Sequence, residues 1–294
     1  MNVQKTLWAF LMGTVVFSPL GSAARTRINN TAHADTGPMQ EGSIPITIYN
    51  GFLVVTTGQI GGVGEKQNFV LDTGTAPSIL NERSAKKMGL RVTRGTLVAV
   101  GRTVSTGQAV LPELELGPIH VTDLPMNVMD LSKLEKSLGM QVAGLIGMDV
   151  LGRASFRLDY EKKELYFGNV ADEGIEIAYD GSTSLALAEA TLQGKHVRLI
   201  VDTGSDLVVV YGSDWNTVDS AQRPSEGTSV AEHVPARRIA NPELALGGKR
   251  FRGMHTYYVP STTKTGYDGF FGVRALKLRG ISFDRDNQMM YLLN

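Results

Sequence analysis

The sequence Phe69-Val70-Leu71-Asp72-Thr73-Gly74-Thr75 recurs later in the chain as Leu199-Ile200-Val201-Asp202-Thr203-Gly204-Ser205. Each copy contains three apolar residues, then Asp-Thr-Gly, then a hydroxyl residue. A carboxylate at the end of a buried strand is costly unless it has a partner or a function. Two such carboxylates at equivalent points of a repeat predict that Asp72 and Asp202 are partners of each other.

The residues around these two copies repeat as well. Gly144-Leu145-Ile146-Gly147 corresponds to Gly269-Phe270-Phe271-Gly272, an offset of 125 residues (269 − 144), whereas the Asp-Thr-Gly copies are offset by 130 (202 − 72). Leu158-Asp159-Tyr160 and Phe283-Asp284-Arg285 also differ by 125. Because there are only two units, the repetition indicates a duplicated lobe rather than a solenoid.

Both halves of the chain resemble the aspartic proteases of the pepsin and retropepsin type. In that family a strand ends in Asp-Thr-Gly, and a later apolar-apolar-Gly segment passes beside it in each lobe. The resemblance covers roughly residues 44 to 294, and the short lobes are closer to retropepsin subunits than to pepsin lobes. It implies an all-β, bilobal acid-protease fold: two pseudo-symmetric, retropepsin-like β-barrel lobes with few short helices, fused in a single chain.

The resemblance also implies a role for each residue of the repeat. Asp72 and Asp202 would form the catalytic dyad, and Thr73 and Thr203 would hydrogen-bond across the interface between the lobes. The other supporting residues would bring amides or hydroxyls to the carboxylates: Gly74, Thr75, Gly204 and Ser205. Gly147 and Gly272 would be the close-packing glycines where the later strand passes each Asp loop, although a simple turn at a strand end is the alternative.

Two carboxylates held together at low dielectric share one proton, because both cannot ionise cheaply. The ionised member would take a proton from a water as that water attacks a peptide carbonyl, and the protonated member would then protonate the leaving amine. This chemistry needs no cofactor and no metal, and the five histidines show no metal-ligand spacing. We expect an acid pH optimum.

A hairpin that covers the cleft is expected between Val98 and Val110. Glycines on either side of Arg102-Thr103-Val104 favour a mobile hairpin, with Gly101, Arg102 and Thr103 as the candidate flap. The segment lacks the tyrosine that pepsin-type flaps carry, which favours a retropepsin-like cleft. The matching segment of the second half, residues 228–239, lacks glycine and is expected to be stiffer or not equivalent.

Helix signals are few. Asn81 to Gly89 has a start typical of a capped helix and a glycine at its end, and Leu131, Leu134 and Leu138 lie at helical spacing before Gly139. Both segments are expected to be packing elements.

The first 24 residues have the pattern of a secretory signal peptide. Lys5 precedes an apolar stretch from Leu7 to Phe17, and Ser22-Ala23-Ala24 offers a cleavage site of small residues. The apolar stretch is too short for a standard membrane span, although an uncleaved anchor is the alternative. We therefore expect a secreted or periplasmic protein with no integral membrane span after signal cleavage. The absence of cysteine excludes disulfides and a thiol nucleophile.

The chain is thus expected to comprise a signal peptide (1–24), a linker or short pro-segment (25–43), an N-terminal lobe (44–172) and a C-terminal lobe (173–294). The net charge is zero, with 29 basic and 29 acidic residues, so nothing indicates binding to nucleic acid. Because one chain supplies both carboxylates, we expect a monomer that acts on a polypeptide substrate.

Two functional hypotheses follow. The first is an aspartic-type endopeptidase, a peptide hydrolase that uses the Asp72/Asp202 dyad. The second is a non-catalytic peptide- or protein-binding module on the same fold, in which the lobes hold a ligand without cleaving it. The intact dyad and its two hydroxyl followers favour the first.

Overall fold

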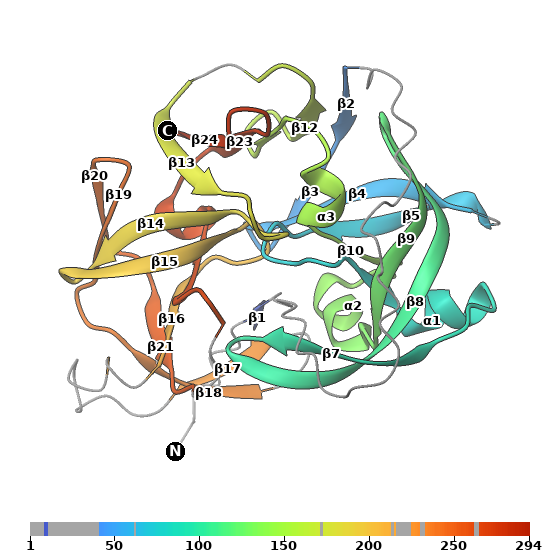
Figure 1. The fold of residues 1–294 in the computed structure, drawn as a ribbon, viewed down its shortest axis with the longest axis horizontal. Helices are drawn as coiled ribbons and strands as arrows, with labels where there is room; N and C mark the ends of the chain where they lie inside the picture. The colour runs from blue at the N-terminus through green and yellow to red at the C-terminus, as the bar shows by residue number, and fades with distance from the viewer. Residues whose placement is uncertain are drawn as a thin grey trace.

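The computed structural model describes residues 9–10, 41–61, 63–170, 173–212, 215, 225–229, 233–261 and 265–294. The expected signal peptide lies outside these residues apart from the short strand β1 (Ala9–Phe10), as do residues 25–40 of the expected linker. The described chain is mostly β-strand and forms two lobes, as predicted, and a shared sheet joins them (Figure 1). None of the helices in this part of the chain has both the length and the apolar character that crossing a membrane requires.

The N-terminal lobe is one sheet in the strand order β3-β4-β5-β10-β6-β9-β8-β7. Its strands are β3 (Thr47–Tyr49), β4 (Leu53–Ile60), β5 (Val63–Leu71), β6 (Ile79–Asn81), β7 (Thr93–Ala99), β8 (Arg102–Leu116), β9 (Ile119–Met129) and β10 (Gly144–Ile146). Strand β5 runs parallel to β10, and β10 runs antiparallel to β6. The end of β5, where Asp72 follows, is therefore in the middle of the sheet.

The helices of this lobe are α1 (Glu82–Lys87), α2 (Ser132–Leu138) and α3 (Met148–Leu151). The Asn81 side chain accepts a hydrogen bond from the Arg83 amide and so caps α1. Gly139 ends α2 in the left-handed conformation (φ 67°), which glycine adopts without steric cost. Both predicted helices are confirmed, and Leu134 and Leu138 of α2 are buried.

The C-terminal lobe repeats this arrangement. Its elements are β14 (Leu187–Leu192), β15 (Lys195–Asp202), β16 (Val208–Tyr211), β17 (Ser225–Ser229), β18 (His233–Arg238), β19 (Glu243–Leu246), β20 (Lys249–Arg252), β21 (Thr256–Val259), β22 (Gly269–Gly272) and the 3-10 helix η1 (Arg274–Leu276). Strand β15 runs parallel to β22, and β22 runs antiparallel to β16. β15, β22 and β16 therefore take the places of β5, β10 and β6.

A third group of strands joins the lobes in the order β13-β24-β23-β11-β12-β2. They are β2 (Gly42–Pro45), β11 (Phe156–Asp159), β12 (Glu164–Phe167), β13 (Ile175–Asp180), β23 (Gly280–Asp284) and β24 (Met289–Leu293). Strand β2 already begins at Gly42, inside the expected linker, because Gly42 and Ser43 pair with Phe167 and Tyr166. Residues 171 and 172, at the expected lobe boundary, lie outside the described residues.

The pairing of β11 with β23 relates the two lobes by an approximate two-fold axis. Phe156 pairs with Phe283, and Leu158 pairs with Ile281. The sequence offset of 125 makes Ile281 the counterpart of Phe156 and Phe283 the counterpart of Leu158. Such reciprocal pairing is the property of an isologous contact. The rings of Phe156 and Phe283 stack with their centroids 4.8 Å apart, so this contact is also part of the core.

Candidate active site

The two Asp-Thr-Gly loops lie at matching ends of buried central strands. The three residues before each Asp, 69–71 in β5 and 199–201 in β15, are apolar and buried, as in strands that are covered on both faces. The Asp72 amide donates to the carbonyl of Ile146, 2.9 Å away, and the carbonyl of Asp202 accepts from the Val273 amide at 3.0 Å. Backbone bonds to the neighbouring strand therefore fix where each loop leaves its sheet.

Gly147 and Gly272 are the points where that neighbouring segment touches the Asp loop. A methyl group added to Gly147 would lie 2.0 Å from the carbonyl oxygen of Thr75, and one added to Gly272 would lie 2.1 Å from that of Ser205. Both distances are far below van der Waals contact. The structure thus places both glycines against the loops, where the family resemblance placed them.

Thr73 and Thr203 join the loops through reciprocal hydrogen bonds. The amide of each threonine donates to the hydroxyl of the other, over 3.1 Å for Thr73 and 3.0 Å for Thr203. Each hydroxyl in turn donates to a carbonyl in the other lobe: Thr73 to Val201 at 2.7 Å, and Thr203 to Leu71 at 3.2 Å. Four buried bonds thus fix the position of one Asp loop relative to the other.

We expect Thr203→Val to lower the free energy of unfolding by about 1–3 kcal/mol. The substitution keeps the side-chain shape but leaves the Thr73 amide and the Leu71 carbonyl buried without their partner. Urea unfolding measures the effect. Thr57→Val is the matched control, because Thr57 is exposed on β4 and should change little. Equal stability of the two variants would contradict this role of Thr203.

The carboxylates of Asp72 and Asp202 are both fully buried, at 0% exposure. Gly74 packs between them: a methyl group added to it would lie 3.0 Å from Oδ1 of Asp202 and 3.1 Å from Oδ1 of Asp72. The Oδ1 atoms also accept hydrogen bonds from the amides of Gly74 (2.9 Å) and Gly204 (2.7 Å), each within its own loop. The structure therefore brings the two predicted carboxylates together with their inner oxygens on the same side.

The outer oxygens of the two carboxylates differ. Oδ2 of Asp72 accepts a hydrogen bond from the Thr75 hydroxyl at 2.8 Å. Oδ2 of Asp202 has no hydrogen-bond partner among the described residues. The Ser205 hydroxyl, which the repeat placed near that oxygen, accepts instead from the amide of Leu207 at 3.1 Å. Thr75 and Ser205, predicted to be equivalent, therefore make different hydrogen bonds. Thr75 bonds its aspartate, whereas Ser205 bonds the backbone amide of Leu207.

This asymmetry affects the pKa of each carboxyl. Burial raises the pKa of Asp72 to about 6, against the opposing effect of hydrogen bonds from Thr75, Asp202 and Gly74, which favour the charged form. Burial, and next the negative charge of Asp72, raise the pKa of Asp202 well above its usual value. The Thr75 hydrogen bond, which Asp202 lacks at its own outer oxygen, favours the charged form of Asp72 over that of Asp202.

A support for the first loop was not predicted from the sequence. The Asp149 carboxylate accepts from the amide of Ser78 at 3.0 Å and from its hydroxyl at 2.7 Å, and the Ser78 hydroxyl accepts from the Gly147 amide at 2.9 Å. These bonds connect α3 to the segment that follows Asp72. The repeat gives no signal for them, because the offset of 125 places Arg274 opposite Asp149.

The expected flap segment is a hairpin of β7 and β8. Its turn is at Val100-Gly101, where both φ angles are positive (50° and 71°), as in a two-residue hairpin turn. Arg102 pairs with Ala99 and Thr103 pairs with Val98, so these two predicted flap residues belong to β8 rather than to the turn. The structure therefore has a hairpin in the expected segment, with Gly101 in its turn and Arg102 and Thr103 at the start of β8.

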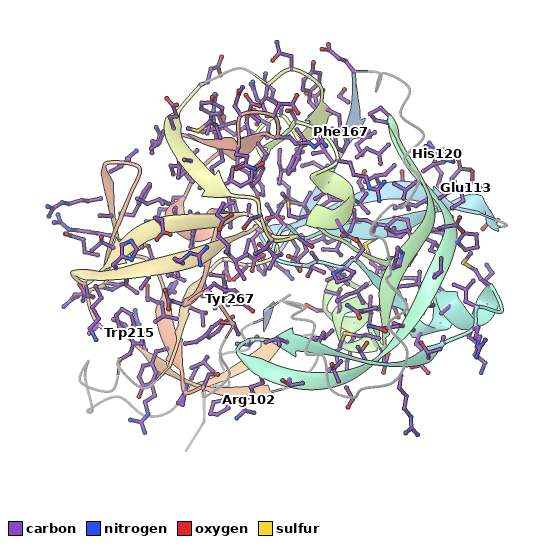
Figure 2. All side chains as sticks on the ribbon, in the orientation of Figure 1. Arg102, Glu113, His120, Phe167, Trp215 and Tyr267 are labelled. Carbon is purple, nitrogen blue, oxygen red and sulfur yellow. The ribbon has the colours of Figure 1, made fainter. Side chains whose placement is uncertain are left out.

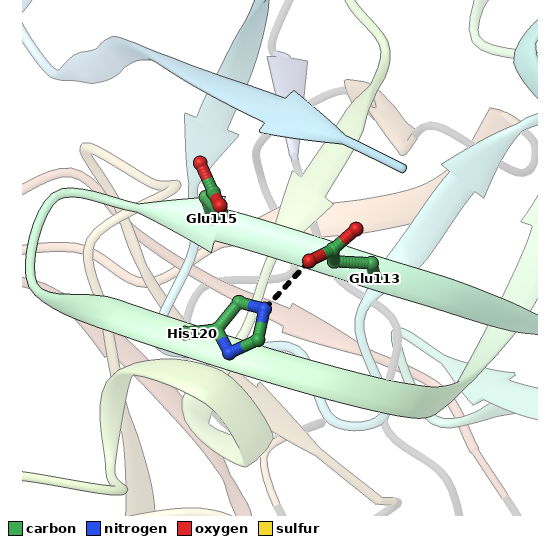
Figure 3. Close-up of side chains that lie close together, drawn as sticks. All are labelled: Glu113, Glu115 and His120. Carbon is green, nitrogen blue, oxygen red and sulfur yellow. Dashed lines mark hydrogen bonds and ion pairs between the residues drawn. The ribbon is translucent and has the colours of Figure 1, made fainter. Parts of the chain in front are cut away.

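Two further features of the surface lie outside the dyad. A cavity of about 260 Å³ is bordered by Ala76 next to the first Asp loop and by Leu185, Leu187 and Tyr267. At the far end of β8 from the Val100-Gly101 turn, the hairpin with β9 brings together Glu113, Glu115 and His120 (Figure 3), whose ligand atoms lie within 4.8 Å of one another. Nε2 of His120 is 2.7 Å from Oε1 of Glu113, and both side chains are exposed, as in a surface ion pair.

The chain belongs to the aspartyl protease family: residues 56–150 and 188–275 match that family, one range in each lobe. Each range contains one of the two Asp-Thr-Gly loops and the glycine that packs against it. A comparison with curated proteins finds no match.

Proposed function

We propose that the protein is an aspartic endopeptidase whose dyad, Asp72 and Asp202, comes from the two lobes of one chain. The observation that carries the proposal is the pair of fully buried carboxyls with their inner oxygens together and their outer oxygens in different surroundings. Membership of the aspartyl protease family supports a role in proteolysis. Cleavage of peptides that is lost when either Asp is replaced tests it.

The two carboxyls take different roles in the proposed reaction. Asp72 carries the negative charge, because hydrogen bonds from Gly74 and Thr75 stabilise it, and it removes a proton from the attacking water. Asp202 keeps its proton, donates it in a hydrogen bond to the peptide carbonyl, and then passes a proton to the leaving amine. As the water oxygen bonds to the carbonyl carbon, the C=O π electrons move to the carbonyl oxygen, and the C–N bond breaks when the C=O bond re-forms and the amine takes its proton.

The rate of cleavage is expected to rise as the pH increases through about 6, because Asp72 must lose its proton. The rate falls again at the higher pH where Asp202 ionises, because burial and the negative charge of Asp72 raise the pKa of Asp202. The acid limb of the profile, where the rate rises, therefore lies at a higher pH than the acid optimum expected from the sequence would require. Thr75→Val removes a donor to the charged form of Asp72, so the limb should move upward by about one pH unit. The measurement is kcat/KM against pH.

Ser205→Ala is the matched control for Thr75→Val. Ser205 occupies the same place in the second loop, but its hydroxyl accepts from the Leu207 amide, and no hydrogen bond to Asp202 is present among the described residues. The alanine variant should leave the acid limb where it is in the parent protein. A limb that moves equally in both variants, or in neither, would contradict the assignment of Asp72 as the ionised member.

We also propose the class of substrate and the location of the protein. The substrate is a polypeptide, held in the cleft between the lobes by a protein that acts as a monomer. The apolar N-terminal segment supports export, so that the substrates are secreted or envelope proteins. Asp72→Asn distinguishes this function from the alternative, a binding module. A protease with this substitution loses cleavage of the peptide, whereas a binding module still binds it.

A further inference from the structure

The tip of the β7–β8 hairpin has an unusual conformation for its residue type. Val100 has a φ of 50°, in the left-handed region that β-branched side chains rarely adopt. A residue at a hairpin tip is ordinarily exposed, but the exposure of Val100 is 0%. Because the local conformation is unfavourable for valine, its surroundings must hold it there.

Those surroundings belong to the other lobe. Val100 packs in an apolar cluster in which only Ala76 shares its lobe, and the other members lie between residues 185 and 270: Leu185, Leu187, Ile200, Leu207, Val209, Tyr211, Ala236, Tyr257, Val259, Tyr267 and Phe270. The hydroxyl of Ser261 donates to the carbonyl of Gly101. A methyl group added to Gly101 would lie 3.2 Å from Cγ of Tyr211. The tip therefore spans the space between the lobes and is anchored by apolar and polar contacts.

This docking site borders the dyad. Ala76 follows Thr75 directly in the first Asp loop, and Leu207, another member of the cluster, lies two residues after Ser205 in the second. The cavity of about 260 Å³ shares Ala76, Leu187 and Tyr267 with the cluster around Val100. In the view of Figure 2, Arg102, the residue after the tip, appears lower than Tyr267, which lies on the side of the C-terminal lobe. The apolar cluster that holds Val100 therefore also borders this cavity.

We propose that the hairpin tip is a built-in competitor of the substrate: Val100 occupies, in the free protein, the place of an apolar substrate side chain of similar size. This inference rests on the proposed peptidase function. The substrate must displace the tip before it reaches the dyad, and peptides with a branched apolar residue in that place bind best. The hydrogen bond from Ser261 to Gly101 sets how strongly the tip competes.

The absence of cysteine makes a direct test possible, because one introduced thiol is the only reporter in the chain. In Val100→Cys the thiol should react with a thiol reagent at least about 10-fold more slowly than in Thr103→Cys, a control at an exposed position of the same hairpin. Adding Ser261→Ala to Val100→Cys should speed the reaction several-fold. Equal labelling rates for the two single-cysteine variants would overturn the docked tip.

Amide hydrogen exchange provides a second measurement, which does not depend on the cysteine variants. Exchange over residues 98–103 should be slow in the parent protein and faster in Ser261→Ala, whose dyad loops are unaltered. Fast exchange in the parent, or no response to Ser261→Ala, would overturn the proposal.

A peptide that cannot be cleaved distinguishes two models of the tip. In the first, the bound peptide displaces the tip; in the second, the tip stays docked when the peptide binds. The probe is a peptide with apolar side chains in which a hydroxyethylene group replaces the scissile bond, and calorimetry measures its binding to Val100→Cys. Competition predicts faster thiol labelling when the peptide is bound, because the tip is displaced. Slower or unchanged labelling with bound peptide would overturn it. If the peptide does not bind, both the proposed peptidase function and the proposed competition are wrong. Slow labelling of the Val100→Cys thiol would in that case still show that the tip is docked in the other lobe.

Discussion

Asp72→Asn and Asp202→Asn are each expected to reduce kcat/KM on a cleavable peptide by about 10³-fold or more. An amide at position 72 cannot take a proton from the attacking water. An amide at position 202 cannot pass a proton to the leaving amine. Because the two carboxyls act as one unit, the double variant should be scarcely less active than either single one. The measurement is the rate of hydrolysis of a defined peptide near pH 6–7, where Asp72 is at least half ionised.

The thermal unfolding of these variants shows whether they lose activity because they no longer fold. Burial raises the folded-state pKa of both carboxyls above the unfolded-state value, so the folded protein binds their protons more tightly. For Asp72, stability is therefore highest below pH of about 4 and falls as the pH rises toward 6. Asn carries no charge and removes this decline, so both variants should unfold at the parent's temperature or above at neutral pH. If an inactive variant unfolds at a temperature well below that of the parent, its loss of activity reflects a loss of folding. Wild-type activity in either variant would contradict the catalytic role of the dyad.

Gly147→Ala and Gly272→Ala are expected to cost about 3 kcal/mol or more of the free energy of unfolding. The added methyl groups would lie 2.0 Å and 2.1 Å from backbone oxygens of the Asp loops, and a backbone cannot move aside as a side chain can. The loops must shift, so the carboxylates move apart and kcat should fall as well. Urea unfolding and kcat measured on the same preparations check both effects.

Gly64→Ala is the control for these glycine variants. Gly64 lies in β5, the strand that leads to Asp72, but a methyl group added there would meet no atom within 4 Å. It should therefore change stability by less than about 1 kcal/mol. If Gly272→Ala were tolerated as well as Gly64→Ala, the close approach of β22 to the second Asp loop would be refuted.

The repeat in the sequence, with the family resemblance of both its copies, was enough to predict the parts of the fold that the two lobes share. Asp72 and Asp202, with Gly147 and Gly272, occupy equivalent positions because each lobe buries the same strands in the same order. The helix after Asn81 was predictable from its cap and its terminal glycine. All of these features depend on local pattern, which a single sequence displays.

The features that differ between the lobes could not be predicted in this way. The hydroxyl of Ser205 turns to Leu207, and Asp149 supports one loop only, because these contacts depend on side-chain geometry that the repeat does not encode. The docking of Val100 in the opposite lobe joins residues far apart in sequence. Glu113 and His120 likewise meet only because β8 and β9 form a hairpin.

The central claim is that one chain contains one complete site, with one carboxyl from each of its lobes. Mixing equal amounts of Asp72→Asn and Asp202→Asn tests it most directly, beside the parent protein on the same peptide library between pH 3 and 8. We expect that the parent cleaves and that the mixture does not, because neither variant chain has both carboxyls. Activity that returns on mixing would show a site shared between two chains, and a parent that cleaves nothing would contradict the peptidase itself.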